Sequence, residues 1–229
     1  MSVVELREVT VRLPTSDGDL PVLSTTTLRL TEQRVALIGP NGSGKSTLAR
    51  LVNGLVAPTA GQVLVDGLDV STDGAAVRRK VGFCFTDPAA QLVMPTAGED
   101  VALSLRRSHP DKRERRRAAV AVLERYGLGA LADRSVHSLS GGQKQLLALA
   151  GVLATGPDVL VADEPTTLLD LRNTRQVADL LFALPQQLLL VTHDLELALR
   201  CDRALLVDAG RVVLDGAPDE VVAAYRGRT

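Results

Sequence analysis

The N-terminal part of the chain carries short apolar runs that are typical of β-strands. Two alternating stretches, at residues 9–11 and 28–30, flank a polar segment at residues 17–19, which predicts two strands and a turn between them. Residues 34–38 form a compact apolar run that predicts a buried strand. The pattern of residues 47–54 predicts a helix that ends at its last residue, because that residue is a glycine and suits a helix C-cap.

The middle of the chain changes character. From residue 97 to residue 154 the strand signal almost disappears and Ala, Leu and Arg dominate, which predicts a helical lobe inserted into a mixed sheet. Beyond it, apolar runs at residues 159–162, 188–192 and 204–207 predict buried strands, with a helix at residues 172–184. Strands that alternate with helices indicate a parallel sheet. The remaining expected elements are strands at residues 63–65, 81–85 and 211–214 and a helix at residues 219–225.

Composition limits the class of protein. The chain has 229 residues, which suits one large domain or a domain with a smaller lobe. Hydrophobic residues make up 45% of it but aromatic residues only 2%, so the core must consist mainly of Leu, Val and Ala. The net charge of −1 gives no indication of a nucleic-acid partner. A basic run at residues 106–117, interrupted by acidic residues, is interpreted as a solvated helix face rather than a contact with anionic lipid.

The chain shows no segment that predicts membrane insertion or export. The N-terminus lacks a basic region followed by an apolar stretch, and no apolar run approaches the roughly 18–20 residues that span a bilayer. Cys84 and Cys201 do not form a disulfide framework and are interpreted as small, reduced core residues, which fits a cytosolic compartment.

The first chemical motif follows the strand expected at residues 34–38 and matches a phosphate-binding loop, G-x-x-x-x-G-K-[ST]. It consists of Gly39, Pro40, Asn41, Gly42, Ser43, Gly44, Lys45, Ser46 and Thr47. The glycines let backbone N–H groups point at phosphate oxygens, and the following helix offers its positive N-terminus to the same anion. Lys45 is expected to reach the β- and γ-phosphates and Ser46 to bind Mg²⁺. By itself, this loop indicates only a nucleoside triphosphate.

A second phosphate-binding feature lies in the helical lobe. Ser140 is a good helix N-cap, and it is followed by Gly141, Gly142 and Gln143 at the start of an apolar helix. Two adjacent glycines at a helix start expose backbone N–H groups that suit an anion. The pattern alone also fits an ordinary capped helix.

Two further motifs place polar side chains at the ends of apolar strands. Asp163 and Glu164 end the run that begins at residue 159, and charge is costly to bury without a function. Asp163 is expected to hold Mg²⁺ through water and Glu164 to act as a general base on the attacking water. His193 follows the strand at residues 188–192, where an imidazole would hydrogen-bond the γ-phosphate and that water.

Together these motifs resemble the ABC ATPase family over essentially the whole chain. Residues 39–46 look like its Walker A motif, residues 139–143 match its signature, residues 159–164 look like Walker B with the catalytic glutamate, residues 168–170 look like its D-loop, and His193 looks like its switch histidine. The resemblance implies that Lys45, Glu164 and His193 carry the chemistry, with ATP and Mg²⁺ as cofactors.

The resemblance also implies a fold and an assembly. The fold class would be α/β, a P-loop NTPase (RecA-like) core with an N-terminal antiparallel β-subdomain and an inserted helical subdomain. A single ABC ATPase domain would span residues 1–229, with the nucleotide-binding core at about residues 1–88 and 155–229 and the helical subdomain at about residues 89–154. In the implied head-to-tail dimer, Ser140 and Gly142 of one subunit serve the γ-phosphate of the other.

Two positions depart from the family pattern. Leu13 stands where the family usually has an aromatic that stacks on adenine, so we expect normal phosphate binding and weaker base discrimination. Thr86 stands where the family has the Q-loop glutamine; its hydroxyl is a shorter candidate ligand for Mg²⁺, beside Ser46 and Asp163. A degenerate, non-hydrolysing subunit is therefore an alternative, although the other active residues are intact.

The stretch after Thr86 resembles the ATPases of energy-coupling-factor importers, which take up vitamins and transition-metal ions. In those proteins the region corresponding to residues 91–101 receives a coupling helix from a transmembrane subunit, and Gln91 would be the subgroup's second glutamine. Residues 166–171 look most like the biotin-uptake ATPases, while cobalt, nickel and other vitamins remain open. The implied partners are a second ATPase subunit, a transmembrane coupling subunit and a separate substrate-binding membrane subunit, with the chain peripheral on the cytoplasmic face.

Two other kinds of ABC protein remain as alternatives. A soluble ABC protein of translation or DNA maintenance typically carries two cassettes or a long coiled-coil insertion, and the sequence has neither. An exporter whose membrane domain is a separate chain would share every catalytic motif. The stretch at residues 91–101 favours the importer.

Overall fold

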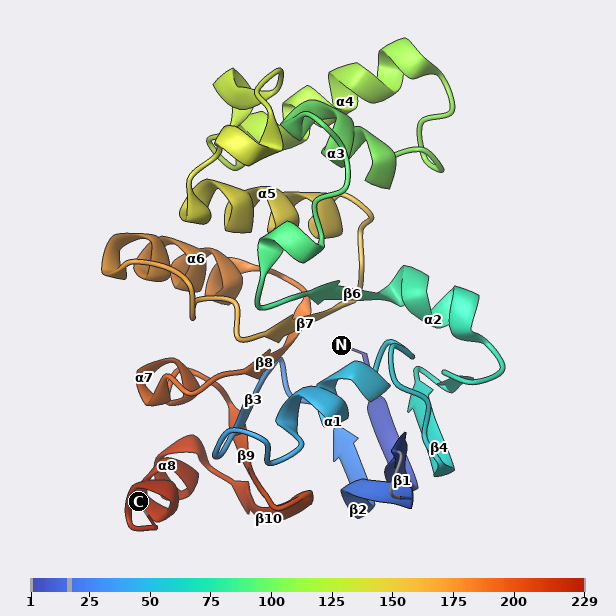
Figure 1. The fold of residues 1–229 in the computed structure, drawn as a ribbon, viewed down its shortest axis with the longest axis vertical. Helices are drawn as coiled ribbons and strands as arrows, with labels where there is room; N and C mark the ends of the chain where they lie inside the picture. The colour runs from blue at the N-terminus through green and yellow to red at the C-terminus, as the bar shows by residue number, and fades with distance from the viewer. Residues whose placement is uncertain (1, 16–17, 229) are drawn as a thin grey trace. The chain divides into compact units, whose positions relative to one another are not determined.

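The computed structural model describes residues 2–15 and 18–228. The chain groups into two compact units. The first comprises the described residues as far as Phe83, together with Asp158–Glu164 and the chain from Leu184 onward. The second comprises Cys84–Pro157 and Pro165–Ala183. Figure 1 labels the helices and strands of both units.

The first unit contains a four-stranded antiparallel sheet, ordered β2-β1-β4-β5. Its strands are β1 (Val4–Thr15), β2 (Gly18–Leu30), β4 (Ala60–Val65) and β5 (Leu68–Asp69). The first two strands are longer than predicted, and the turn expected at residues 17–19 is wrong for its last two residues. Gly18 and Asp19 pair with Thr15 and Pro14 and so belong to the sheet, whereas Asp17 lies outside the described residues.

A six-stranded sheet forms the centre of the first unit, ordered β10-β9-β3-β8-β7-β6. Its strands are β3 (Arg34–Ile38), β6 (Val81–Cys84), β7 (Val159–Asp163), β8 (Gln187–Val191), β9 (Arg203–Asp208) and β10 (Arg211–Gly216). The predicted parallel sheet is confirmed, because β3 pairs in parallel with β8 and β9, and β7 pairs in parallel with β8. Every residue of β3, β7 and β8 is buried, as expected for central strands covered on both faces.

Helices of the first unit pack against this sheet (Figure 1). They are α1 (Lys45–Leu51), α7 (Leu195–Ala198) and α8 (Pro218–Arg226), whereas α2 (Gly74–Lys80) contacts β5 of the antiparallel sheet. α1 contacts β7 and β8, whereas α8 contacts β9 and β10. The bounds predicted for the first helix, residues 47–54, are wrong at both ends. Gly44 has a φ of 102° and caps the helix, so the first turn begins at Lys45, and the helix ends at Leu51, before the left-handed Gly54.

The second unit is helical, which confirms the character predicted for residues 97–154. It contains α3 (Ala97–Ser104), α4 (Lys112–Arg125), α5 (Gly141–Leu153) and α6 (Leu171–Ala183), with short 3₁₀ turns at Pro88–Ala90, Gly129–Leu131 and Val136–Ser138. Side-chain caps define the starts of three helices, because Thr96, Asp111 and Ser140 each accept hydrogen bonds from N–H groups of the first turn.

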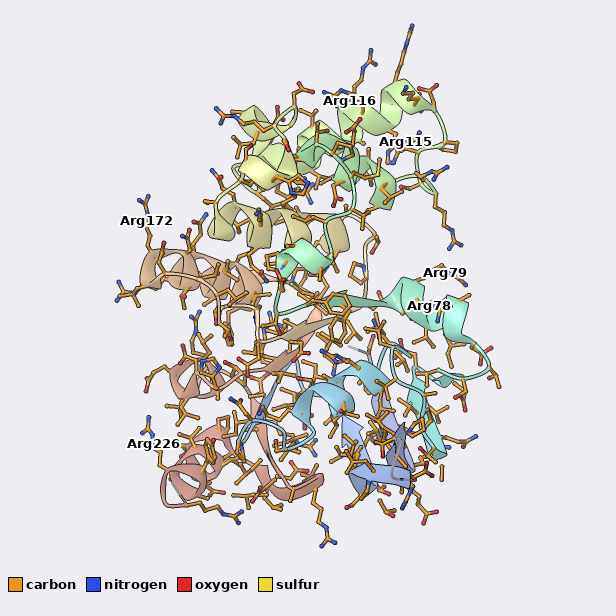
Figure 2. The ribbon with its side chains drawn as sticks, in the orientation of Figure 1. Arg78, Arg79, Arg115, Arg116, Arg172 and Arg226 are labelled. Atoms are coloured by element: carbon orange, nitrogen blue, oxygen red, sulfur yellow. The ribbon has the colours of Figure 1, made fainter. Side chains whose placement is uncertain are left out.

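Part of the basic run on α4 holds the second unit together. The guanidinium of Arg116 pairs with Asp133, and Arg115 donates to the carbonyls of His109 and Pro110 at 3.0 Å each (Figure 2). These contacts fix the connections on either side of the helix.

Both cysteines are buried thiols that form no disulfide, as predicted. Burial raises the pKa of the Cys201 thiol to about 12, so this thiol is protonated at neutral pH.

Candidate functional site

Three motifs of the first unit follow neighbouring strands at one edge of the central sheet. β3, β8 and β7 lie side by side and run in parallel, so their carboxyl ends share that edge. The loop after Ile38, the pair Asp163–Glu164 and the segment that contains His193 follow these three strands. The edge beyond the carboxyl ends of parallel strands is the usual ligand-binding edge of such sheets.

The loop between β3 and α1 has a backbone that only glycine permits at two positions. Gly39 has a φ of 141°, and a Cβ there would overlap the carbonyl of Val207 on β9. Gly44 has a φ of 102° and lies against the Val22 carbonyl, 3.0 Å from where a Cβ would be. The loop bounds a hollow of about 280 Å³, and its lining residues are Val22, Asn41, Gly42, Ser43, Gly44, Lys45, Ser46, Thr47 and Glu164.

Two side chains of this loop are arranged for an anion. Ser43 Oγ is buried and has no hydrogen-bond partner among the described residues. Lys45 is only 5% exposed, and its Nζ donates to the carbonyls of Gly39 at 2.7 Å and Pro40 at 2.8 Å. Burial lowers the pKa of Lys45, while the carboxylates of Glu164 and Asp163 act in the opposite direction. An oxyanion fits this loop, because it would satisfy the orphaned hydroxyl and face the ammonium.

Asp163 ends β7 as a buried carboxylate with partners on α1. Its Oδ1 accepts from Ser46 Oγ at 2.8 Å, and its Oδ2 lies 3.2 Å from Arg50 Nη2. The predicted pair of metal-binding residues, Ser46 and Asp163, is therefore in direct contact. Arg50 was not a predicted site residue; its position four residues after Ser46 on the same helix is the only sequence signal for it.

Glu164 and His193 also meet. His193 Nδ1 lies 2.6 Å from Glu164 Oε2, and the Glu164 N–H donates to the Val191 carbonyl at 3.0 Å. Glu164 has a φ of 53°, an unfavourable conformation for a residue with a side chain. Such backbone strain is typical of functional positions. The carboxylate lines the hollow beside the loop, and the imidazole orients it.

The second unit carries the other predicted phosphate site at the start of α5. Ser140 Oγ accepts from the Gln143 N–H at 3.3 Å, and Gln143 Oε1 accepts from the Ser140 N–H at 2.9 Å. This reciprocal pair is a capping box, so the predicted N-cap is confirmed. The side chain of Gln143 is engaged in the cap. Gly141, the first residue of the helix, is exposed.

A residue that sequence reasoning missed supports this helix start. Gly142 is buried, and a Cβ on it would overlap the side chain of Asn173 on α6. Asn173 is fixed by Asp170, which accepts from its backbone N–H at 2.9 Å and from Nδ2 at 2.8 Å. Asn173 therefore connects residues 168–170 to the glycine pair. The sequence does not indicate this contact, because Asn173 and Gly142 come together only in the folded chain.

The remaining predicted residues are Leu13, Thr86 and Gln91. Leu13 is on β1, 44% exposed, and does not line the hollow beside the loop, whereas Val22 does. Thr86 is in the second unit and half-buried. Gln91, also in that unit, connects two segments: its Oε1 accepts from the Phe85 N–H at 3.3 Å, and its Nε2 donates to the Ala148 carbonyl of α5 at 3.5 Å.

Comparison with known proteins identifies the family of this chain. The protein family described as ABC transporter matches residues 25–167. The chain belongs to the ABC transporter family. This ABC transporter subunit is an ATP-binding ATPase with the P-loop fold, as predicted.

Relatives of this ABC ATPase include proteins that are named for their roles in transport. It is 44% identical over 211 residues to the biotin transport ATP-binding protein BioM of Rhizobium etli, covering 92% of this chain and 94% of the relative. It is 37% identical over 226 residues to the energy-coupling factor transporter ATP-binding protein EcfA2 of Methanospirillum hungatei, covering 95% of this chain and 56% of the relative. The suspected resemblance to energy-coupling-factor ATPases is therefore supported.

Solved structures share the fold of this ABC ATPase. The dimeric ATP-binding cassette MJ0796, in a post-hydrolysis state with ADP and Pi, has a TM-score of 0.83 at 31% identity and covers 94% of this chain and 98% of its own. CbiO1 from Clostridium perfringens, part of the complex cbiONQ, has a TM-score of 0.81 at 33% identity and covers 98% and 92%.

No described helix is long and apolar enough to cross a membrane. Within the same residues, no group of three or more His, Cys, Asp or Glu side chains is arranged to hold a metal ion.

Gly142 packs so closely against Asn173 that it leaves no room for a side chain. Gly142→Ala should lower the free energy of unfolding by about 1–3 kcal/mol, because the added methyl overlaps a fixed side chain. Urea denaturation of Gly142→Ala, of Asn173→Ala and of the double variant measures this change in the free energy of unfolding. Asn173→Ala in the same chain should recover most of the loss, since it removes the overlapping atoms.

Gly151→Ala is the matched control on the same helix. Its nearest contact would be Ser104 Oγ at 3.7 Å, an ordinary separation, so alanine should be tolerated there. Strictly additive effects of Gly142→Ala and Asn173→Ala would contradict the packing argument.

Proposed function

We propose that this ABC ATPase powers a multi-subunit membrane importer of the energy-coupling-factor type, with biotin as the favoured substrate. One observation carries the ATPase mechanism: Lys45, Asp163 and Glu164 converge at the carboxyl edge of one sheet, around a loop shaped for phosphate. The importer type and substrate rest on similarity to BioM and EcfA2.

Phosphate binding is assigned to the loop after β3. Ser43 Oγ, which lacks a partner, and the backbone N–H groups of residues 41–47 suit phosphate oxygens. Lys45 holds two loop carbonyls, and we propose that it exchanges them for the β- and γ-phosphate oxygens.

Magnesium is assigned to Ser46 and Asp163. Their contact at 2.8 Å puts a hydroxyl and a carboxylate, both hard oxygen ligands, beside the phosphate loop. Mg²⁺ takes few protein ligands when nucleotide phosphates supply the others, so a larger cluster of carboxylates is not required. Bound Mg²⁺ would neutralise charge on the phosphoryl oxygens. Thr86 stays a candidate for contact with Mg²⁺ or its water through its hydroxyl.

Water activation is assigned to Glu164 and His193. The carboxylate borders the hollow beside the phosphate loop, and its contact with His193 holds it in one orientation. Glu164 then accepts a proton from the attacking water, while His193 donates a hydrogen bond to developing charge.

The second half of each ATP site is assigned to a partner ATPase subunit. Gly141 is exposed at the N-terminus of α5, and two leucines near residue 170 are exposed as well, Leu168 at 62% and Leu171 at 67%. Exposed leucines beside an anion-binding helix start suit a surface that a second copy, or a related subunit, covers when ATP is bound.

Glu164→Gln tests this mechanism. The amide cannot accept the proton, so ATP turnover should fall by a factor of about 10² or more while ATP binding persists. The ATP-bound variant should accumulate as a dimer in size-exclusion chromatography. Glu124→Gln, an exposed position on α4, removes the same charge and should behave like wild type. Wild-type turnover in Glu164→Gln would sink the assignment.

Contact with the membrane partner is assigned to the second unit. A cleft of about 340 Å³ there is lined by apolar and charged side chains together, and its lining residues are Met94, Gly98, Glu99, Ala102, Leu103, Arg106, Lys112, Arg115 and Arg116. This cleft overlaps the stretch of residues 91–101. Gln91 connects that stretch to α5, so a partner that moves it would also move the signature helix. We propose a coupling segment of a transmembrane subunit as the occupant, with the chain peripheral on the cytoplasmic face.

Leu103→Asp tests the coupling surface. Leu103 is 37% exposed and lines the cleft. A carboxylate in its place would have to be buried under the partner, so Leu103→Asp should prevent co-purification with the membrane subunits. ATP binding by the isolated subunit should persist, because the phosphate loop is unchanged. Leu20→Asp, 55% exposed on β2, is the matched control and should leave the complex intact. Loss of the complex in both variants, or in neither, would count against this surface.

Substrate choice is tested in the assembled transporter. We expect labelled biotin uptake to require this chain and to stop with Glu164→Gln. Uptake of cobalt or nickel instead would assign the transporter to the metal branch, which the resemblance of the stretch after Thr86 leaves as the second candidate.

A further inference from the structure

Asp163 carries a buried negative charge next to a cation that the ATPase mechanism above does not use. The side chain is 1% exposed, and the Arg50 guanidinium lies 3.2 Å from its Oδ2. An uncompensated buried carboxylate costs several kcal/mol, so a neighbouring cation matters more here than at the surface.

Arg50 approaches Asp163 from the same helix as the proposed metal ligand. α1 begins at Lys45, Ser46 lies in its first turn, and Arg50 lies one turn later on the same face. Ser46 therefore holds Oδ1 and Arg50 holds Oδ2 of one carboxylate. Lys45 also acts on this carboxylate, and it is occupied by the loop carbonyls.

The Arg50 contact is a single hydrogen bond rather than a two-pronged ion pair. One terminal nitrogen reaches Oδ2, while Nε is buried and has no hydrogen-bond partner among the described residues. The side chain as a whole is 42% exposed, so solvent is available when the guanidinium leaves. A contact of this kind neutralises charge and is readily replaced by a stronger cation.

We propose that Arg50 is a positioning residue that neutralises Asp163 while magnesium is absent and opposes magnesium when it arrives. This inference rests on the proposed Mg-ATP site. The guanidinium and a divalent cation carry the same sign and act on one carboxylate, so binding of either weakens the other by the same factor. Arg50 thereby stabilises the nucleotide-free subunit and favours metal release after hydrolysis.

Arg50→Met and Arg50→Lys separate charge from packing. Methionine keeps the apolar stem without the cation, whereas lysine keeps the charge. In EDTA without nucleotide, Arg50→Met should lower the midpoint of thermal unfolding by about 3 °C, because Asp163 loses its neighbour, and Arg50→Lys should restore most of it. Arg78→Met, on the exposed face of α2 (Figure 2), removes the same charge away from the site and should leave the midpoint unchanged.

Magnesium titration with ATP present gives the decisive readout. The Mg²⁺ concentration at half-maximal thermal stabilisation should fall about fivefold in Arg50→Met, while Arg50→Lys and Arg78→Met should resemble wild type. A merely structural ion pair would lower stability in EDTA without moving this concentration, and that result overturns the inference. Equal behaviour of the Met and Lys variants would overturn it too.

The proposed function fails separately from this inference. If wild type shows no Mg²⁺-dependent stabilisation with ATP, the assignment of Ser46 and Asp163 is wrong and the inference falls with it. If wild type responds and Arg50→Met matches it, only the role of Arg50 is wrong.

Discussion

The buried carboxylate of Asp163 is the constraint on which the nucleotide site depends. β7 is buried along its whole length and ends in a charge that must be compensated, because it has left water. Ser46 and Arg50 on α1 supply that compensation, which fixes the helix after the phosphate loop against the end of the strand. The next residue, Glu164, adopts a strained backbone and meets His193 from the neighbouring strand. One compensated charge thus holds together groups from three parts of the sequence.

In the second unit, the start of α5 is defined by its own capping side chains and by Asn173 of α6. The capping box of Ser140 and Gln143 satisfies two backbone N–H groups at this helix start, and Gly141 at the helix tip stays exposed. This exposed tip is the part that we propose the unit offers to a partner's nucleotide. Asn173 closes the other side against Gly142. Glycine is therefore needed at Gly142 for packing within the subunit, independently of any contact with phosphate.

Sequence pattern predicted the parts of this protein that follow local rules. Buried strands, the phosphate loop and the Ser140 cap each depend on residues close together in the chain, and the family followed from their order. The start of the first helix was misplaced because Gly44 adopts a left-handed conformation that residue type alone does not announce. Arg50 and Asn173 were missed because their roles come from partners 113 residues and 31 residues away, Asp163 and Gly142. Such contacts require the fold.

Thr86 replaces a glutamine expected of the family, so this residue decides whether the chain can hydrolyse ATP by itself. ATP turnover by the purified chain, alone and with its membrane partners, measured beside Thr86→Gln, is the most direct test. We expect wild type to hydrolyse ATP, because Lys45, Glu164 and His193 are assembled at the site. We also expect the membrane partners to raise the rate of ATP turnover. Turnover only in Thr86→Gln would contradict these expectations and would make the natural chain a degenerate subunit that depends on another ATPase.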